Sequence, residues 1–91
     1  MTNEQLAGLV RWAALNRYRI GSTALLDMLI LAHHNPGSEP LSREQLAPLF
    51  AVEPSSVDQH ISRLRAAGLV EAIAARPARE GWVFRRIGPP N

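Results

Sequence analysis

The sequence predicts a mainly α-helical chain that ends in a small β-hairpin. Apolar residues recur at helical spacing as far as residue 67, and after Gly68 the spacing changes to the alternation of strands. Proline and glycine fall between these periodic stretches, where turns are expected. With 91 residues, of which 46% are apolar, the chain can bury one modest core.

The first helix is predicted near residues 3–17, where Thr2 and Gln5 form a capping box. Its apolar stripe consists of Leu6, Leu9, Val10 and Ala13, widened by Trp12 and Leu15. "NRYRIGS" is expected to end this helix, and Ser22 to cap a second one that runs to about His34. The second helix is apolar on several sides, which predicts a central position. "NPGSEP" then forms a turn.

A third, short helix is predicted at 43–50, with a second capping box formed by Ser42 and Gln45. Pro48 lies inside it and should tighten or kink it. The turn "AVEP" leads to a fourth helix at 54–67, since Pro54 suits the first helical position and Gly68 suits the C-terminal cap.

Two strands should follow, "LVEAIAA" and "WVFRRI", joined by the loop "RPAREG". Alternation places Trp82 and Phe84 on one face of the hairpin and Val83 and Ile87 on the other. The predicted organisation is an N-terminal helical segment (1–20), a main domain (21–88) and a frayed tail (89–91).

Two helices joined by a tight turn, the second polar on its outer face and followed by a basic hairpin, form a winged helix-turn-helix layout. A B-DNA major groove admits one helix, and Ser, Gln and Arg can bond to base edges and phosphates. The net charge is only +2, but six arginines and two acids lie from His60 onward. That distribution indicates an anionic partner for the C-terminal third, although a solvated basic surface would fit it equally well.

"LSREQL", "SSVDQHISRLR" and "REGWVF" resemble the DNA-binding domain of OmpR/PhoB-type response regulators, and "LRAAGLVE" is similar to MarR-type regulators. The resemblance covers about residues 21–87 and implies a winged helix-turn-helix fold. The sequence departs from the family pattern in three respects. It lacks a receiver domain, it has helix 3–17 in place of a β-platform, and it has Ser55 where the family has Arg. Control by phosphorylation is therefore not inferred.

The layout and the resemblance together predict a set of DNA-binding residues. These are Arg43, Ser55, Ser56, Gln59, His60, Ser62, Arg63, Arg65 and, at the hairpin tip, Arg76 and Arg79. Arg63 is the strongest candidate, because Arg to guanine is the commonest specific contact. Asp58 is interpreted as a helix N-terminal charge or an arginine partner. His60 could contact phosphate or pack partly buried.

The apolar stripe of the first helix has two possible roles. Its residues Leu6, Leu9, Val10, Trp12 and Ala13 could cover the chain's own core or pair with the same helix of a second subunit. Small regulators of this kind gain site size from two copies, so we predict a homodimer that recognises a two-fold operator.

Other function classes are disfavoured. The chain has no cysteine, the neighbouring His33 and His34 have no acidic cluster beside them, and no catalytic motif is present. We therefore predict no enzyme activity, metal, cofactor or small-molecule ligand. The longest apolar run, "LLDMLILA", is too short to span a membrane, and "MTNEQ" lacks the layout of a signal peptide, so a cytoplasmic, nucleoid-associated protein is expected.

The predicted function is a sequence-specific double-stranded DNA-binding transcription regulator, most simply a repressor. The chain has Arg but no Lys and is rich in Ala and Pro, a composition typical of a GC-rich bacterial or phage genome. The alternative is a winged-helix protein-interaction module that docks on RNA polymerase or another regulator through Trp12 or Trp82.

Overall fold

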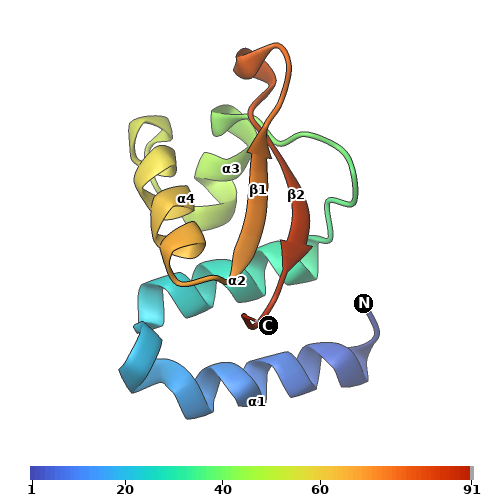
Figure 1. The fold of residues 1–91 in the computed structure, drawn as a ribbon, viewed down its shortest axis with the longest axis vertical. Coiled ribbons are helices and arrows are strands. Elements are labelled where there is room, and N and C mark those ends of the chain that lie inside the picture. The colour runs from blue at the N-terminus through green and yellow to red at the C-terminus, as the bar shows by residue number, and fades with distance from the viewer. Residues whose placement is uncertain (91) are drawn as a thin grey trace.

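The computed structural model describes residues 1–90, which fold as a mainly helical chain with one small hairpin (Figure 1). The elements in order are α1 (Asn3–Ile20), α2 (Ser22–His34), α3 (Arg43–Phe50), the 3₁₀ turn Pro54–Ser56, α4 (Val57–Ala66), β1 (Val70–Ala74), the 3₁₀ turn Ala78–Glu80 and β2 (Trp82–Ile87). The predicted mainly α fold with a small β-hairpin is therefore confirmed. No helix within residues 1–90 combines the length and the apolar character needed to cross a membrane.

Helix α2 occupies the centre, as its apolar sequence predicted. Helix α1 lies along one side of it, while α3, α4 and the hairpin lie on the other side (Figure 1). The tip of the hairpin is at the far end of the molecule from α1. The fully buried side chains come from α2, α3, α4 and the start of the hairpin: Met28, Leu31, Leu46, Val57, Ile61, Leu64 and Leu69.

Helix α1 begins as predicted but ends later. The capping box of Thr2 and Gln5 is present. The helix continues to Ile20, three residues beyond the predicted end, because Ile20 packs against the core. Gly21, at φ 105°, then turns the chain. Ser22 is not the cap of α2, because Gly21 occupies that position without a side chain.

The apolar stripe of α1 covers the chain's own core. Leu9 and Ala13 are buried, and Trp12 packs against the core at partial exposure. Of the two predicted roles, Leu9 and Ala13 thus have the core-covering one, and these two side chains leave little surface for a second subunit. Leu6 is half-buried, and Val10 keeps 47% of its surface exposed.

Helices α3 and α4 are joined by a short turn. The capping box of Ser42 and Gln45 is confirmed, and α3 stays helical across Pro48. The predicted helix 54–67 is divided, because its first turn is 3₁₀ and α-helical bonding starts at Val57.

Gly68 ends α4, as predicted, in a left-handed conformation with φ 72°. The N–H of Leu69 donates to the carbonyl of Leu64 at 2.9 Å, and the N–H of Gly68 to that of Arg65 at 3.0 Å. These two bonds form a Schellman motif, which satisfies the last carbonyls of the helix.

The hairpin contains a bulge that changes which side chains face the core. Ala72 pairs with Phe84 while Glu71 pairs with Arg86, so Arg85 is the extra residue. One extra residue reverses the alternation beyond it, and Ile87 therefore packs against the core like Phe84. The prediction that Ile87 faces the opposite side was wrong for this reason.

Backbone bonds attach the hairpin to the segment before α3. Leu41 and Trp82 form a bridge in which each N–H donates to the other's carbonyl, at 2.9 and 3.0 Å. The neighbouring Gly81 lies against the Leu41 backbone, where a Cβ would come within 1.8 Å of the carbonyl oxygen.

The C-terminal tail is held by an arginine. The Arg86 guanidinium donates to the carbonyls of Gly68, Gly88 and Pro89, the last two at 3.1 and 2.9 Å. The predicted frayed tail at 89–91 is thus corrected for Pro89, and Asn91 lies outside the described residues.

Candidate nucleic-acid interface

The outer face of α4 and of the 3₁₀ turn before it is mainly polar and exposed. Val57, Ile61 and Leu64 fix the orientation of α4 because they are buried on its other side. The exposed residues away from that side include Ala66 and the ion-paired Asp58. The other exposed polar residues are Ser55, Gln59, Ser62, Arg63 and Arg65, and none of these five side chains bonds to another group in residues 1–90. The half-buried Ser56 makes no side-chain bond either. This face therefore presents free hydrogen-bonding groups to solvent.

An exposed ion pair joins the starts of α3 and α4. Arg43 donates from Nε and Nη2 to the two carboxylate oxygens of Asp58, at 3.0 and 2.8 Å. Its guanidinium also lies over the Trp82 ring, 5.5 Å from the centroid. The interpretation of Asp58 as an arginine partner is confirmed. The predicted DNA contact of Arg43 must therefore be made by a guanidinium that already has a carboxylate partner.

His60 is not part of the exposed face, and of its two predicted roles the structure shows the partly buried packing one. Its Nδ1 lies 2.6 Å from Oδ2 of Asp27 on α2, and the two side chains are 12% and 4% exposed. The imidazole ring also stacks on Phe50 of α3 at 5.5 Å between centroids. The pair of Asp27 and His60 connects α4 to the helices beneath it, and the residue that sequence reasoning missed is Asp27. Its only signal was a single acid inside an apolar run.

The environment of Asp27 favours its protonated form. Burial raises the pKa of this carboxyl above its ordinary value of 3.8, and this outweighs the hydrogen bond and charge of His60 and the charge of Arg63, which lower it. The folded chain therefore binds the Asp27 proton more tightly than the unfolded chain does. The resulting stabilisation is complete below pH 3.8 and is lost as the pH rises through the raised pKa.

This linkage gives a testable pH dependence. The free energy of unfolding of the wild type minus that of Asp27→Asn should fall as the pH rises from about 3.8, because the variant lacks this titration. Urea denaturation followed by tryptophan fluorescence at a series of pH values measures the difference. A difference that stays constant or increases over this window contradicts the assignment.

The hairpin tip carries a second basic group. Arg76 and Arg79 are both exposed, and within residues 1–90 neither side chain is in an ion pair. They lie between the end of β1 and the start of β2, in the part of the molecule that also holds α4 (Figure 1). The hairpin tip lies far from α1, whereas the C-terminal half of α4, with Arg63, lies beside the junction of α1 and α2.

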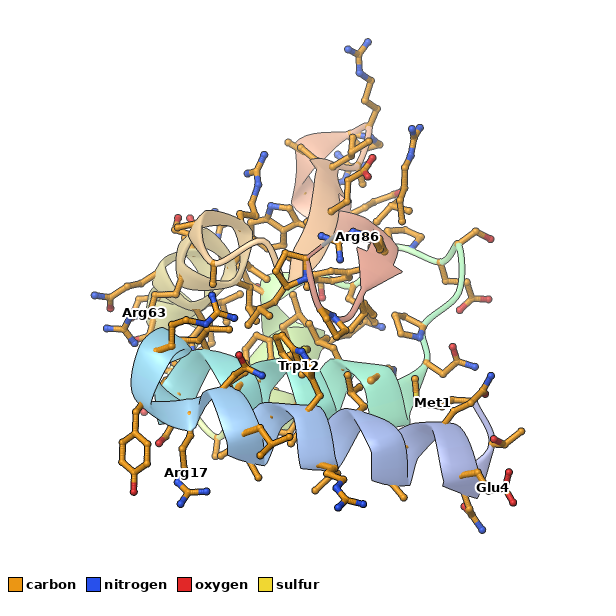
Figure 2. All side chains as sticks on the ribbon, turned by 60° about the horizontal axis from the view of Figure 1, so that its bottom comes forward. Met1, Glu4, Trp12, Arg17, Arg63 and Arg86 are labelled. Carbon is orange, nitrogen blue, oxygen red and sulfur yellow. The ribbon has the colours of Figure 1, made fainter. Side chains whose placement is uncertain are left out.

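Figure 2 shows how differently the arginines are placed. Arg86 lies at the end of β2 within the body of the protein, where it holds the tail, whereas Arg63 projects from α4 next to the junction of α1 and α2. Arg17 points away from the rest of the chain. Trp12 points from α1 into the body of the protein, where it packs on the core.

Residues 1–90 contain no evident metal-binding group. Among residues 1–90 no three His, Asp or Glu side chains gather closely enough to bind a metal ion, and His33 and His34 are exposed at the end of α2. Comparisons with protein-family models, with curated proteins and with solved structures found no match to this chain. The likeness to response regulators accordingly stays a prediction from the sequence motifs.

Proposed function

We propose that this chain is a sequence-specific double-stranded DNA-binding transcription regulator with a winged helix-turn-helix fold. In this proposal α3 and α4 form the helix-turn-helix, α4 enters the major groove, and the hairpin is the wing. The protein acts as a repressor in the cytoplasm by occupying promoter DNA, and it has no catalytic role.

The observation that carries the proposal is the free polar face of α4. A helix face of an ordinary surface is commonly dominated by Glu and Lys, whereas this one presents Ser55, Gln59 and Ser62, flanked by Arg63 and Arg65. Short hydroxyl and amide groups can approach base edges closely, and arginines beside them can bond phosphates. The exposed arginines of the hairpin tip supply cations on the same half of the molecule.

The rival reading, a protein-docking module, receives less support. It required Trp12 or Trp82 as an exposed anchor, but both indole rings pack against the core. Arg43 additionally covers one face of Trp82. The charged and polar features are therefore the more accessible ones.

A homodimer remains part of the proposal, with a smaller contact surface than the sequence indicated. Val10 is exposed and lines an apolar groove with Leu6, Leu29, Ile30 and Leu49. Pairing of two copies through this groove would relate them by a two-fold axis, which is the symmetry of an inverted-repeat operator.

Selection of random duplex DNA on the purified protein at near-physiological salt tests the function. An enriched inverted repeat supports a two-fold dimer on specific DNA. An enriched single half-site keeps DNA binding and removes the dimer. Recovery of no preferred sequence overturns the proposal.

The variant Arg63→Ala should weaken binding to the selected duplex by about 10-fold, a loss of about 1.4 kcal/mol that is within the range of one charged contact. It should also flatten the fall of affinity with salt, because one cation is removed. Fluorescence anisotropy over a salt series measures both quantities. Arg17→Ala is the matched control, because Arg17 is an equally charged surface residue that points away from α4 (Figure 2). Equal affinities for the two variants would exclude the α4 face as the binding surface.

A further inference from the structure

An open cleft of about 680 Å³ separates the junction of α1 and α2 from the C-terminal half of α4. Two arginines from distant parts of the sequence line it, Arg19 near the end of α1 and Arg63 on α4. The first turn of α2 adds the hydroxyls of Ser22 and Thr23, and no acidic side chain belongs to the lining. The cleft is therefore positively charged and has hydrogen-bond donors on three helices.

Arg19 is held in place by a neutral group. Its Nη2 and Nε donate to Oδ1 of Asn16, at 2.8 and 3.3 Å, and the amide nitrogen of Asn16 donates to the carbonyl of Trp12 at 2.8 Å. Trp12 in turn packs on the core. The guanidinium is thus oriented through two bonds to a rigid part of α1, while its charge has no carboxylate partner within residues 1–90. Fixing a side chain beforehand lowers the entropy lost when it binds a ligand.

Arg63 has no hydrogen-bond partner within residues 1–90. The charge of Arg63 lowers the pKa of Asp27, but this acid is buried and already bonded to His60. Arg63 shares the cleft with Ala66 and Ala67, whereas Gln59 and Ser62 do not line it. Arg63 therefore lies at one edge of the polar face of α4, and Gln59 and Ser62 lie outside the cleft.

We propose that this cleft binds one phosphodiester of the DNA backbone beside the groove that α4 enters, with Arg19 and Arg63 as its two cationic contacts. The inference rests on the proposed DNA-binding function and adds α1 to the interface. Two guanidinium groups line this cleft without an acid, and a phosphate is an anion that arginine side chains bind through charge-assisted hydrogen bonds. Gln59 and Ser62 are then left to read base edges, and Arg63 contacts the backbone instead of the guanine predicted from the sequence.

A contact to the DNA backbone and a contact to a base can be distinguished by how their loss changes the affinity for DNA. Loss of a phosphate contact weakens all duplexes by the same factor and reduces the slope of log affinity against log salt by about 0.9, whereas loss of a base contact relaxes the preference at one position. A slope change of about 0.9 corresponds to roughly five-fold weaker binding at about 0.15 M salt relative to 1 M, where the salt-dependent contribution vanishes.

The experiment measures Arg19→Gln, Arg63→Gln and the control Arg17→Gln on the selected duplex and on a panel with single base-pair changes, each over a salt series. Arg17 lies on the same helix and is exposed, but it does not line the cleft, and it donates to the carbonyl of Ala14 at 2.9 Å. We expect Arg19→Gln and Arg63→Gln to weaken every duplex uniformly by about five-fold and to reduce the salt slope, and Arg17→Gln to match the wild type. Thermal unfolding of each variant shows whether the fold is intact.

Two outcomes overturn the inference while leaving the proposed function in place. One is an Arg19→Gln variant that binds like Arg17→Gln, which removes α1 from the interface. The other is an Arg63→Gln variant whose loss is confined to one base pair, which makes Arg63 a base-reading residue. A wild type that shows no salt-dependent binding to any duplex overturns the proposed function itself, and this inference with it.

Discussion

Replacing Gly81 by alanine should lower the free energy of unfolding by about 3–5 kcal/mol. The added Cβ would lie 1.8 Å from the carbonyl oxygen of Leu41, so the hairpin must move away and lose the two backbone bonds between Leu41 and Trp82. The backbone of Gly81, at φ 97°, is also one that alanine adopts only with strain. A chain of this size has roughly 5–13 kcal/mol of stability, so the variant should be largely destabilised.

Gly21→Ala is the matched control for this experiment. Gly21 has a similar φ of 105°, but a Cβ there would meet no atom within 4 Å. The variant should therefore show the cost of backbone strain alone, about 1–3 kcal/mol. Urea denaturation of both variants measures the difference. Equal losses would mean that the hairpin can shift without cost and that its attachment to Leu41 contributes nothing.

Asp27→Ala should lower the free energy of unfolding by about 2–4 kcal/mol, because it leaves His60 without a partner at a site that water barely reaches. His60→Ala should have a comparable cost, since it leaves the buried carboxyl unpaired. The double variant should lose less than the sum of the two single variants, because the interaction between the side chains can be lost only once. Additive losses would show that the two residues stabilise the fold independently.

Asp58→Ala provides the contrast for the buried pair. Asp58 has an arginine partner on another helix, but both side chains of this pair are about half exposed, at 49% and 55%. Water solvates such charges well, so the variant should change stability much less than Asp27→Ala. If the two variants are equally destabilised, burial is not what makes the pair of Asp27 and His60 important.

The pair of Asp27 and His60 also bears on the proposed interface. It lies under α4, with Phe50 of α3 stacked on the imidazole, and so connects the three helices that determine where the polar face points. Under the proposed function, a variant of this pair would weaken DNA binding without contacting DNA, because it would change the orientation of α4.

Local signals in the sequence predicted most helix boundaries correctly, because they depend on residues only a few positions apart. The capping boxes at Thr2 and Ser42 and the glycine stop at Gly68 were all found where the residue types require them. The predicted end of α1 at residue 17 was three residues too early, because the polar stretch "NRYR" indicates a helix end before Gly21 is reached. What keeps α1 helical to Ile20 is a contact with the core, which local sequence does not encode.

The composition of the polar face was also readable from the sequence, since periodicity alone separates Val57, Ile61 and Leu64 from the residues opposite them. The same periodicity left His60 ambiguous, because it lies at the boundary between the two faces. Only its neighbour in space, Asp27, which is 33 positions away in the chain, decides that the imidazole points inward. The cleft lined by Arg19 and Arg63 likewise depends on residues that are far apart in the sequence and close in space.

The sequence by itself determined which segments are helix or strand, where most of them begin and end, and which residues of α4 are polar on its outer side. Those properties follow from caps, turns and periodicity, which act over a few residues. The tertiary structure alone decided that Leu9 and Ala13 belong to the core of one chain and that His60 is withdrawn from the surface. It also decided that the bulge at Arg85 turns Ile87 inward. These outcomes depend on which elements pack against one another, and that is set by the burial of apolar surface across the whole chain.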